Sequence, residues 1–294
     1  MSAATDNGDF LAGMAASSRA RSEAAQKLAP ARELRSRIAD LPAAPRLKLA
    51  GFDLIAEVKL RSPAMGLLKD AGAEDVGARV TTYAKAGAAA VSILTEPSRF
   101  DGSLADLEAG ARSLAPLGVP AMRKDFIVDD YQVTEGRAAG ASGVLAILRM
   151  TPRADLERLI DTALEFDMFV LLETFDAPDI ELAHALVDSR RAHRDLLLVG
   201  VNSRDLVTLK VVPGRLDQLA GMLPRDNKRV AESGVATPDD ASRMAAKGYD
   251  LALVGSALMS AKDPYALASA MLGEARVARA QAEAWTRAGK AISP

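Results

Sequence analysis

Short apolar segments recur along the chain and are separated by stretches with helical spacing. The apolar segments are rich in Val, Ile and Leu, and they occupy residues 53–58, 88–94, 119–123, 142–148, 168–173, 196–201, 228–233 and 250–255. Between two of them, Leu156, Leu159, Ile160 and Ala163 form one apolar stripe. Continuous apolar strands that alternate with helices predict a parallel sheet with both faces covered.

The number of strand–helix units favours one α/β architecture. Eight units over roughly 220 residues fit a closed (β/α)8 TIM barrel better than an open doubly wound sheet, although periodicity alone leaves the open sheet as an alternative. Thr151 before Pro152 is typical of a helix N-cap followed by proline in the first turn. Gly87 and Gly248 are expected to end helices ahead of the next strands.

The two ends of the chain are expected to lie outside the barrel. Residues 10–39 are rich in Ala, Arg, Glu and Leu and predict helix with a break at Pro30, and residues 41–45 predict a linker. We therefore divide the chain into an N-terminal helical extension (1–45), a catalytic barrel (46–275) and a C-terminal helical tail (276–294).

Composition excludes several classes of function. The 294 residues include 37 Lys plus Arg and 39 Asp plus Glu, so the net charge of −2 gives no electrostatic footprint for nucleic acid or an anionic membrane. The absence of Cys excludes disulfides, thiolate nucleophiles and Cys-based metal sites. No apolar run approaches the roughly 18–20 residues of a membrane helix, so a cytoplasmic protein is expected. His184 and His193 lack HExxH-type spacing, and we expect two surface histidines and no metal site.

Charged and polar side chains collect at the ends of the predicted strands. They are Glu57, Lys59, Thr95, Glu96, Arg123, Lys124, Asp125, Glu173, Asn202, Arg204 and Glu232. In a parallel barrel these strand ends share the face on which such barrels carry their chemistry. A single Glu–Lys pair at a rim is more often a structural salt bridge. Two lysines with several carboxylates at different strand ends favour a catalytic pocket.

A phosphate site is predicted beside this pocket. Ser233 and Gly234 follow the seventh strand, and Gly255 and Ser256 follow the eighth. Backbone N–H groups at such loop–helix junctions bind phosphate, and the loops after strands seven and eight are the usual phosphate site of the fold. The expected partner is therefore a small phosphorylated substrate.

Six motifs follow one another along most of the chain. They are IAEVKLRSP, SILTEPSRFDGSLADL, RKDFIVDDYQV, GVNSRDLVTL, VAESGV and LVGSALM. In order and spacing they resemble the indole-3-glycerol phosphate synthase family of tryptophan biosynthesis, over about residues 10–275. The resemblance implies N-terminal helices over the barrel mouth and no metal or organic cofactor. It also implies conversion of 1-(o-carboxyphenylamino)-1-deoxyribulose 5-phosphate into indole-3-glycerol phosphate, CO2 and water.

The resemblance further implies the catalytic roles. Lys124 would be the general acid for ring closure, and Glu173 would be its partner carboxylate. Lys59, supported by Glu57, would contact the substrate and assist the later dehydration. Asn202 would orient a substrate hydroxyl or Glu173. Two acids and a carboxylate suit this chemistry, because a carbonyl oxygen must gain a proton and a hydroxyl must then leave.

The same resemblance implies the substrate-binding residues. Arg204 would meet the anthranilate carboxylate or secure the rim. The aromatic ring would lie against Phe100, Phe126 and Leu145, with further contacts from Ser62 and Glu232. The phosphate would be held by Lys59, Ser233, Gly234, Gly255 and Ser256.

Several positions depart from the family pattern and keep alternatives open. Leu60 replaces a common basic residue, Ala64 a serine and Ala146 a bulkier apolar residue, and residues 174–176 are an unusual sequence after Glu173. Ala64 puts substrate affinity or loop closure in question, so a paralogue acting on a modified anthranilate is one alternative. The others are an aldolase with a Schiff-base lysine and a degenerate barrel that only binds. We expect a monomer or weak homodimer that associates with other tryptophan-pathway enzymes.

Overall fold

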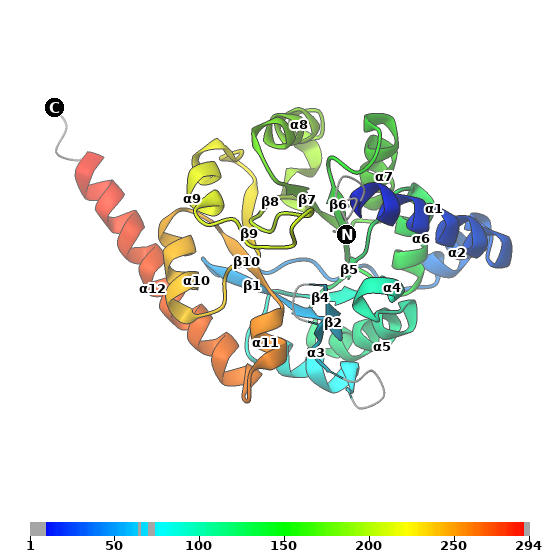
Figure 1. Ribbon diagram of the computed structural model, residues 1–294, viewed down its shortest axis with the longest axis horizontal. Helices are drawn as coiled ribbons and strands as arrows, with labels where there is room; N and C mark the ends of the chain where they lie inside the picture. Colours follow the sequence, from blue (N-terminus) through cyan, green and yellow to red (C-terminus); the bar gives the residue numbers. More distant parts are fainter. Residues whose placement is uncertain (1–9, 64–65, 70–73, 291–294) are drawn as a thin grey trace, which may run out of the picture.

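Eight parallel strands form a closed barrel in the computed structural model, which describes residues 10–63, 66–69 and 74–290 (Figure 1). The barrel strands are β1 (Asp53–Val58), β4 (Ala90–Leu94), β5 (Ala121–Lys124), β6 (Gly143–Ile147), β7 (Phe169–Thr174), β8 (Leu197–Asn202), β9 (Lys228–Glu232) and β10 (Leu251–Val254). The first strand pairs with both β4 and β10, which closes the sheet. The prediction of a (β/α)8 barrel is confirmed, and the open sheet is excluded.

Helices follow the strands and surround the barrel (Figure 1). They are α3 (Val76–Lys85), α4 (Pro97–Phe100), α5 (Leu104–Leu114), α6 (Asp130–Ala138), α7 (Arg153–Glu165), α8 (Ala177–Asp188), α9 (Arg215–Leu219), α10 (Pro238–Ala246) and α11 (Ser256–Ser260). Short 3-10 helices are η1 (Ala115–Leu117), η2 (Arg191–Leu196) and η3 (Ala220–Met222). Their buried apolar faces pack on the outward-facing residues of the strands and form one continuous core.

The predicted helix ends are right for the glycines and wrong for Thr151. Gly87 and Gly248 have φ angles of +100° and +93°, the left-handed conformation that lets a chain leave a helix. Pro152, with extended backbone angles, takes the N-cap position of α7 itself. Thr151 therefore lies one residue too early to cap the helix, and its buried hydroxyl has no partner in the part of the chain that the structure describes.

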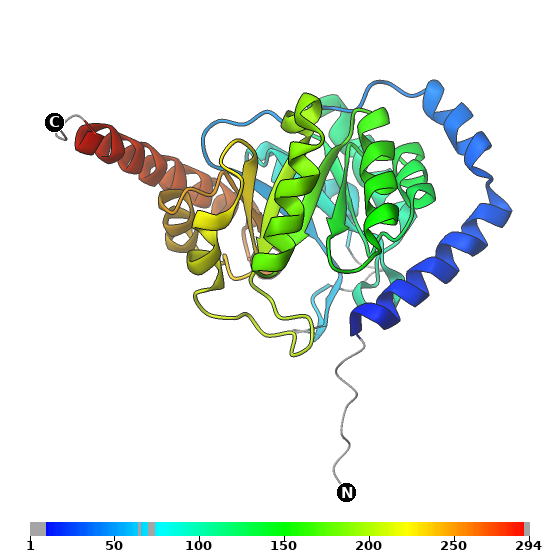
Figure 2. The same cartoon turned by 90° about the horizontal axis from the view of Figure 1, so that it is seen from above.

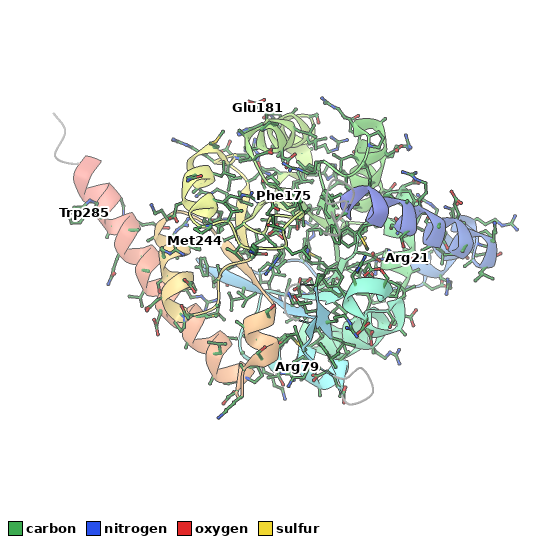
Figure 3. The ribbon with its side chains drawn as sticks, viewed as in Figure 1. Arg21, Arg79, Phe175, Glu181, Met244 and Trp285 are labelled. Atoms are coloured by element: carbon green, nitrogen blue, oxygen red, sulfur yellow. The ribbon has the colours of Figure 1, made fainter. Side chains whose placement is uncertain are left out.

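The N-terminal extension consists of α1 (Phe10–Leu28) and α2 (Ala31–Ala39), with the predicted break at Pro30 between them. Both helices lie along one side of the barrel and contact α6 (Figure 2). On the opposite side, α12 (Pro264–Lys290) packs on α10 and α3 and then extends beyond the barrel (Figures 1 and 2). The predicted division at residues 275 and 276 falls within this single helix. Trp285, 83% exposed, lies on its outer part (Figure 3).

A two-stranded antiparallel sheet that the sequence analysis did not predict follows β1. It pairs β2 (Arg61–Ser62) with β3 (Gly66–Leu67). Ala64, whose effect on loop closure was in question, lies outside the described residues, as do residues 1–9 and 291–294. Among the helices of the described segments, none has the length and apolar character needed to cross a membrane.

Candidate active site

A cavity of about 290 Å³ opens at the carboxyl ends of the barrel strands. Its lining includes every residue that the sequence analysis assigned to catalysis, substrate or phosphate: Glu57, Lys59, Ser62, Phe100, Lys124, Phe126, Leu145, Glu173, Asn202, Arg204, Glu232, Ser233, Gly234, Gly255 and Ser256. These residues are far apart in the chain, and the barrel brings them together. Their placement is therefore as expected, while their individual roles stay predictions.

Three of the polar residues at the strand ends do not line the cavity. They make hydrogen bonds to residues next to it. Thr95 donates its hydroxyl to the Asp125 carboxylate at 2.7 Å. Glu96 caps α4 through the backbone N–H groups that follow it. Arg123 points to the opposite side of β5 from Lys124, because side chains alternate along a strand, and it donates to the Gln132 carbonyl at 2.7 Å.

Two lysine–carboxylate pairs hold the centre of the cavity. Lys59 Nζ lies 2.7 Å from Glu57 Oε1, and Lys124 Nζ lies 3.4 Å from Glu173 Oε2. The carboxylates are almost fully buried at the ends of β1 and β7, while both lysines retain some exposure toward the cavity. Each ammonium group can therefore reach a bound substrate while a buried carboxylate fixes its position.

The buried charges determine one another's protonation. Burial alone would lower the pKa of Lys124, but the carboxylates of Glu173 and Glu57 outweigh it and hold this pKa above its ordinary value. For Glu57, burial favours the neutral acid, but the ammonium groups of Lys59 and Lys124 outweigh it and lower the pKa. Lys124 is consequently charged and able to donate a proton, and Glu57 is ionised.

A third buried carboxyl, Glu232, has no ion-pair partner among the residues that the structure describes. It is 1% exposed, and none of those residues donates a hydrogen bond to either of its oxygens. Burial raises its pKa well above the ordinary value, and the charge of Glu173 raises this pKa further, although Lys124 opposes the change. Glu232 therefore keeps a proton where an exposed glutamate is ionised, and it can donate that proton in a hydrogen bond to Glu173.

The free energy of unfolding of Glu232→Gln is expected to exceed that of the wild type by an amount that grows as the pH rises. The unfolded chain releases the Glu232 proton above roughly pH 4.3, whereas the folded chain retains it, so this group lowers the free energy of unfolding by about 1.4 kcal/mol per pH unit until its raised pKa is reached. Gln matches the neutral carboxyl in shape and does not ionise. Urea unfolding at pH 4, 5, 6 and 7 should show a variant that resembles the wild type at pH 4 and becomes relatively more stable at each step. A difference that does not vary with pH would mean that Glu232 is ionised in the folded protein.

Helix α1 is anchored to the loop that carries Lys124. The two terminal guanidinium nitrogens of Arg21, Nη2 and Nη1, donate to the Asp125 carboxylate at 2.8 and 3.1 Å, and Ser18 donates to the Phe126 carbonyl. Asp125 also accepts from Thr95 and, at 3.3 Å, from Arg123. Arg21 lies on α1, more than one hundred residues from the loop (Figure 3). Helix α1 of the N-terminal extension thus fixes the position of Asp125, the residue next to the predicted general acid Lys124.

The apolar wall of the cavity contains residues that the sequence analysis missed. Phe10, the first residue of α1, packs edge-to-face on Phe126 with ring centroids 5.9 Å apart. The loop after β8 contributes Leu206, Leu209 and Val211. Three apolar side chains in a surface loop indicate that the loop contacts a ligand, and this pattern could have identified them. No pattern in the sequence indicates that Phe10 lines the cavity.

The predicted phosphate end has the backbone that such a site needs. Ser233 and Gly234 have φ angles of +62° and +80°, so the chain turns sharply after β9. The Ser233 carbonyl accepts a hydrogen bond from Ser203 at 2.8 Å, which fixes that turn. On the neighbouring strand, Gly255 and Ser256 begin α11, whose first N–H groups have no partner within the helix by geometry.

Comparison with known proteins identifies the family to which this chain is similar. The family model for indole-3-glycerol phosphate synthase matches residues 13–271. The chain belongs to the indole-3-glycerol phosphate synthase family. It is 43% identical to a relative of that name from Nocardioides sp., over 82% of this chain and 89% of the relative. It is 40% identical to indole-3-glycerol phosphate synthase 1 of Streptomyces coelicolor, over 73% and 75% of the two chains.

Two solved structures with low sequence identity share the fold. One is 3-hexulose-6-phosphate synthase from Salmonella typhimurium, with a TM-score of 0.57 and 15% identity over 79% of this chain and 100% of that one. The other is thiamine phosphate pyrophosphorylase from Pyrococcus furiosus, with a TM-score of 0.53 and 16% identity over 78% and 97% of the two chains. At these identities the likeness shows the barrel alone.

Three departures from the synthase family pattern that lie in the described residues, Leu60, Ala146 and Phe175, do not line the cavity. Leu60 is buried. Ala146 faces the outside of the barrel, since its neighbours Leu145 and Ile147 line the cavity. Phe175, labelled in Figure 3, packs against Arg149, whose guanidinium carbon is 4.7 Å from the ring centroid. These side chains pack the barrel or its rim.

Neither histidine lies at the cavity. His184 on α8 contacts the Met222 carbonyl at 2.9 Å, and His193 lies in η2. Within residues 10–63, 66–69 and 74–290, no three His, Cys, Asp or Glu side chains are grouped so that they could hold a metal ion.

Proposed function

We propose that this protein is an indole-3-glycerol phosphate synthase. The substrate would be 1-(o-carboxyphenylamino)-1-deoxyribulose 5-phosphate, and the products would be indole-3-glycerol phosphate, CO2 and water. One observation carries the proposal: the Lys124–Glu173 and Lys59–Glu57 pairs converge in one cavity of a chain that belongs to this family.

The charges of the cavity suit a substrate with a phosphate and a carboxylate. Lys59, Lys124 and Arg204 face Glu57, whose pKa is lowered, and Glu173, while the raised pKa of Glu232 keeps that carboxyl neutral. The carboxylate of Asp125 is balanced separately by Arg21 and Arg123. The cavity therefore has a surplus of positive charge, and in a largely enclosed site such charges act more strongly than in water.

The first step would be ring closure. The ring carbon that bears the carboxylate attacks the ketone carbon of the sugar chain, and the electron pair of the carbonyl moves onto its oxygen. Lys124 donates a proton to that oxygen, which becomes a hydroxyl. Because Glu173 lies beside Lys124, it keeps the ammonium group in place and stabilises its charge before the transfer.

Two losses would then restore an aromatic product. CO2 leaves from the same ring carbon, and its bonding electrons return to the six-membered ring. The new hydroxyl leaves as water after taking a proton from Lys59, and a carboxylate, assigned to Glu173, takes the proton released as the second double bond of the five-membered ring forms. Phe100, Phe126 and Leu145 would hold the aromatic ring during these steps.

The test is a fluorescence assay of indole-3-glycerol phosphate formation, with the purified protein, the carboxyphenylamino substrate and no added metal. Product fluorescence that rises in proportion to enzyme concentration is expected. Ring-substituted substrates in the same assay test the alternative of a modified anthranilate. Absence of turnover at high enzyme concentration with all of these substrates would refute the proposal.

The aldolase alternative requires a neutral lysine as a nucleophile. Both candidate lysines are ion-paired, and the pKa of Lys124 is raised because the Glu173 and Glu57 carboxylates outweigh its burial, which opposes that role. Borohydride treatment with a sugar phosphate should therefore leave no covalent adduct, whereas a Schiff-base enzyme would be trapped. We also propose that the chain acts in the cytoplasm as a monomer or weak homodimer, beside other enzymes of the pathway.

A further inference from the structure

Gly200 occupies an unusual position in the barrel. It lies in the middle of β8, between Leu198 and Asn202 on the inward-facing side of the strand, where a barrel normally places a packing side chain. Its φ angle lies outside the left-handed region, so its backbone conformation does not require glycine. The reason for a residue without a side chain here must lie in its surroundings.

The space above Gly200 is filled by Glu232. A Cβ atom added to Gly200 would lie 2.1 Å from Glu232 Oε1 and 3.0 Å from a methyl carbon of Leu171. The first distance is far inside van der Waals contact. The backbone has little freedom to retreat, because the Gly200 carbonyl accepts a hydrogen bond from the Thr174 hydroxyl at 2.7 Å. Glu232 therefore adopts its observed position only because residue 200 has no side chain.

That position directs Glu232 toward Glu173. Glu232 belongs to β9, and Glu173 lies on β7 in register with Gly200 of the intervening β8. By leaning across β8 at Gly200, the Glu232 carboxyl is directed toward Glu173, whose charge and side-chain hydrogen bonding raise the pKa of Glu232 after burial does. Lys124 and Glu57 are the other charged groups that act on Glu232. Glu173 thus has a charged ammonium on one side and a protonated carboxyl on the other.

We propose that Gly200 is a positioning residue that allows Glu232 to cross β8 and share a proton with Glu173. The proposal rests on the function given above, in which Glu173 works with Lys124. A hydrogen bond from the Glu232 acid orients the Glu173 carboxylate toward Lys124 and the reacting atoms. Gly255 likewise leaves room for charged groups of the site. A Cβ on Gly255 would lie 2.4 Å from Glu57 Oε1 and 2.9 Å from Lys59 Nζ.

The test is a double-mutant cycle between Gly200→Ala and Glu232→Ala. Gly200→Ala pushes the Glu232 carboxyl away from Glu173, and displacements of about 1 Å in an active site cost up to roughly 100-fold in rate. We expect kcat to fall 10- to 100-fold with KM changed less than threefold. In the Glu232→Ala background no carboxyl remains to be displaced, so Gly200→Ala should cost less than a factor of three. An equal cost in both backgrounds, or full activity of Gly200→Ala, would overturn the proposal.

A rescue and a matched control separate positioning from general damage to the barrel. Glu232→Asp shortens the acid by one methylene group, so Gly200→Ala/Glu232→Asp should have a higher kcat than Gly200→Ala alone, and a lower kcat would contradict the proposal. Because the double variant relieves the contact, it also provides the measurement if Gly200→Ala does not fold. Gly110→Ala on α5 introduces a comparable contact, 2.4 Å from an Ile93 methyl carbon, outside the site, and should leave kcat unchanged.

A measurement without substrate distinguishes failure of this proposal from failure of the proposed function. Infrared difference spectra at neutral pH should show a carboxylic acid C=O band in the wild type that Glu232→Gln removes. Gly200→Ala should weaken or shift the same band, while Gly110→Ala should not. A band that Gly200→Ala leaves unchanged would refute the positioning role, whatever reaction the enzyme catalyses.

Discussion

Lys124→Met is expected to lower kcat by about 1000-fold while the protein stays folded. A positioned acid typically contributes 10²- to 10⁴-fold, and this fall corresponds to about 4 kcal/mol of lost transition-state stabilisation. Met preserves most of the volume and the apolar stem but carries no proton. The measurement is the fluorescence assay under saturating substrate, with circular dichroism to verify the fold.

The control for this variant is Lys48→Met, which removes an exposed lysine far from the cavity. It should have wild-type kcat and KM. If Lys124→Met retained full activity, Lys124 would not be the acid, and Lys59 would be the remaining lysine that could donate the proton.

Asp125→Asn is expected to cause the largest loss of stability. The Asp125 side chain is fully buried and contacts both Arg21 and Arg123, so removal of its charge leaves the buried guanidinium of Arg123 with fewer partners. The new amide would also direct N–H groups at guanidinium N–H groups. Breaking a buried ion pair costs about 3 kcal/mol or more, which corresponds to a fall in Tm of roughly 6–12 °C. Urea and thermal unfolding at pH 7 measure this loss.

The pH dependence identifies the charge as the cause. Burial opposes the ionisation of Asp125, but Arg123 and Arg21 outweigh it and lower the pKa to about 2. A carboxyl with a lowered pKa stabilises the fold above the pKa of the unfolded chain, near 3.9. This contribution, about 2.6 kcal/mol, disappears as the pH falls toward 2. The difference between wild type and Asp125→Asn should therefore shrink below pH 4. Arg35→Ala, which breaks the exposed pair with Glu165, should cost less than about 1 kcal/mol and serves as the control.

The barrel was predictable from the sequence because most of its strands are recognisable as short runs of apolar residues. Most of the strands are buried on both faces, so they appear as apolar runs, and in a parallel barrel the ends of the strands share one face. This reasoning places Lys59, Lys124 and Glu173 around one cavity, where the structure has them. It did not decide between Arg123 and Lys124, because shifting a strand by one residue exchanges its two faces. The family motif made that choice.

The contacts of the N-terminal extension could not be predicted in this way. The sequence of α1 predicts a helix, but helical periodicity does not say which loop the helix contacts. The Arg21–Asp125 pair joins residues 104 positions apart, and Phe10 reaches the cavity from the start of the helix. The paired strands β2 and β3 have two residues each, too few to form a pattern. The proposed role of Gly200 could not be predicted from the sequence either, since it depends on the position of the Glu232 carboxyl from the next strand.

The opposite placement of the two terminal helices matters for fusion and immobilisation. Phe10 lies in the cavity wall, so a bulky domain attached close to that residue would be held at the barrel mouth and would obstruct substrate entry. Helix α12 has 27 residues, a length of about 40 Å, and its outer part extends away from the barrel on the side opposite α1 and α2. A biosensor or a surface-coupled catalyst built from this chain should therefore be attached beyond α12, which would serve as a rigid spacer.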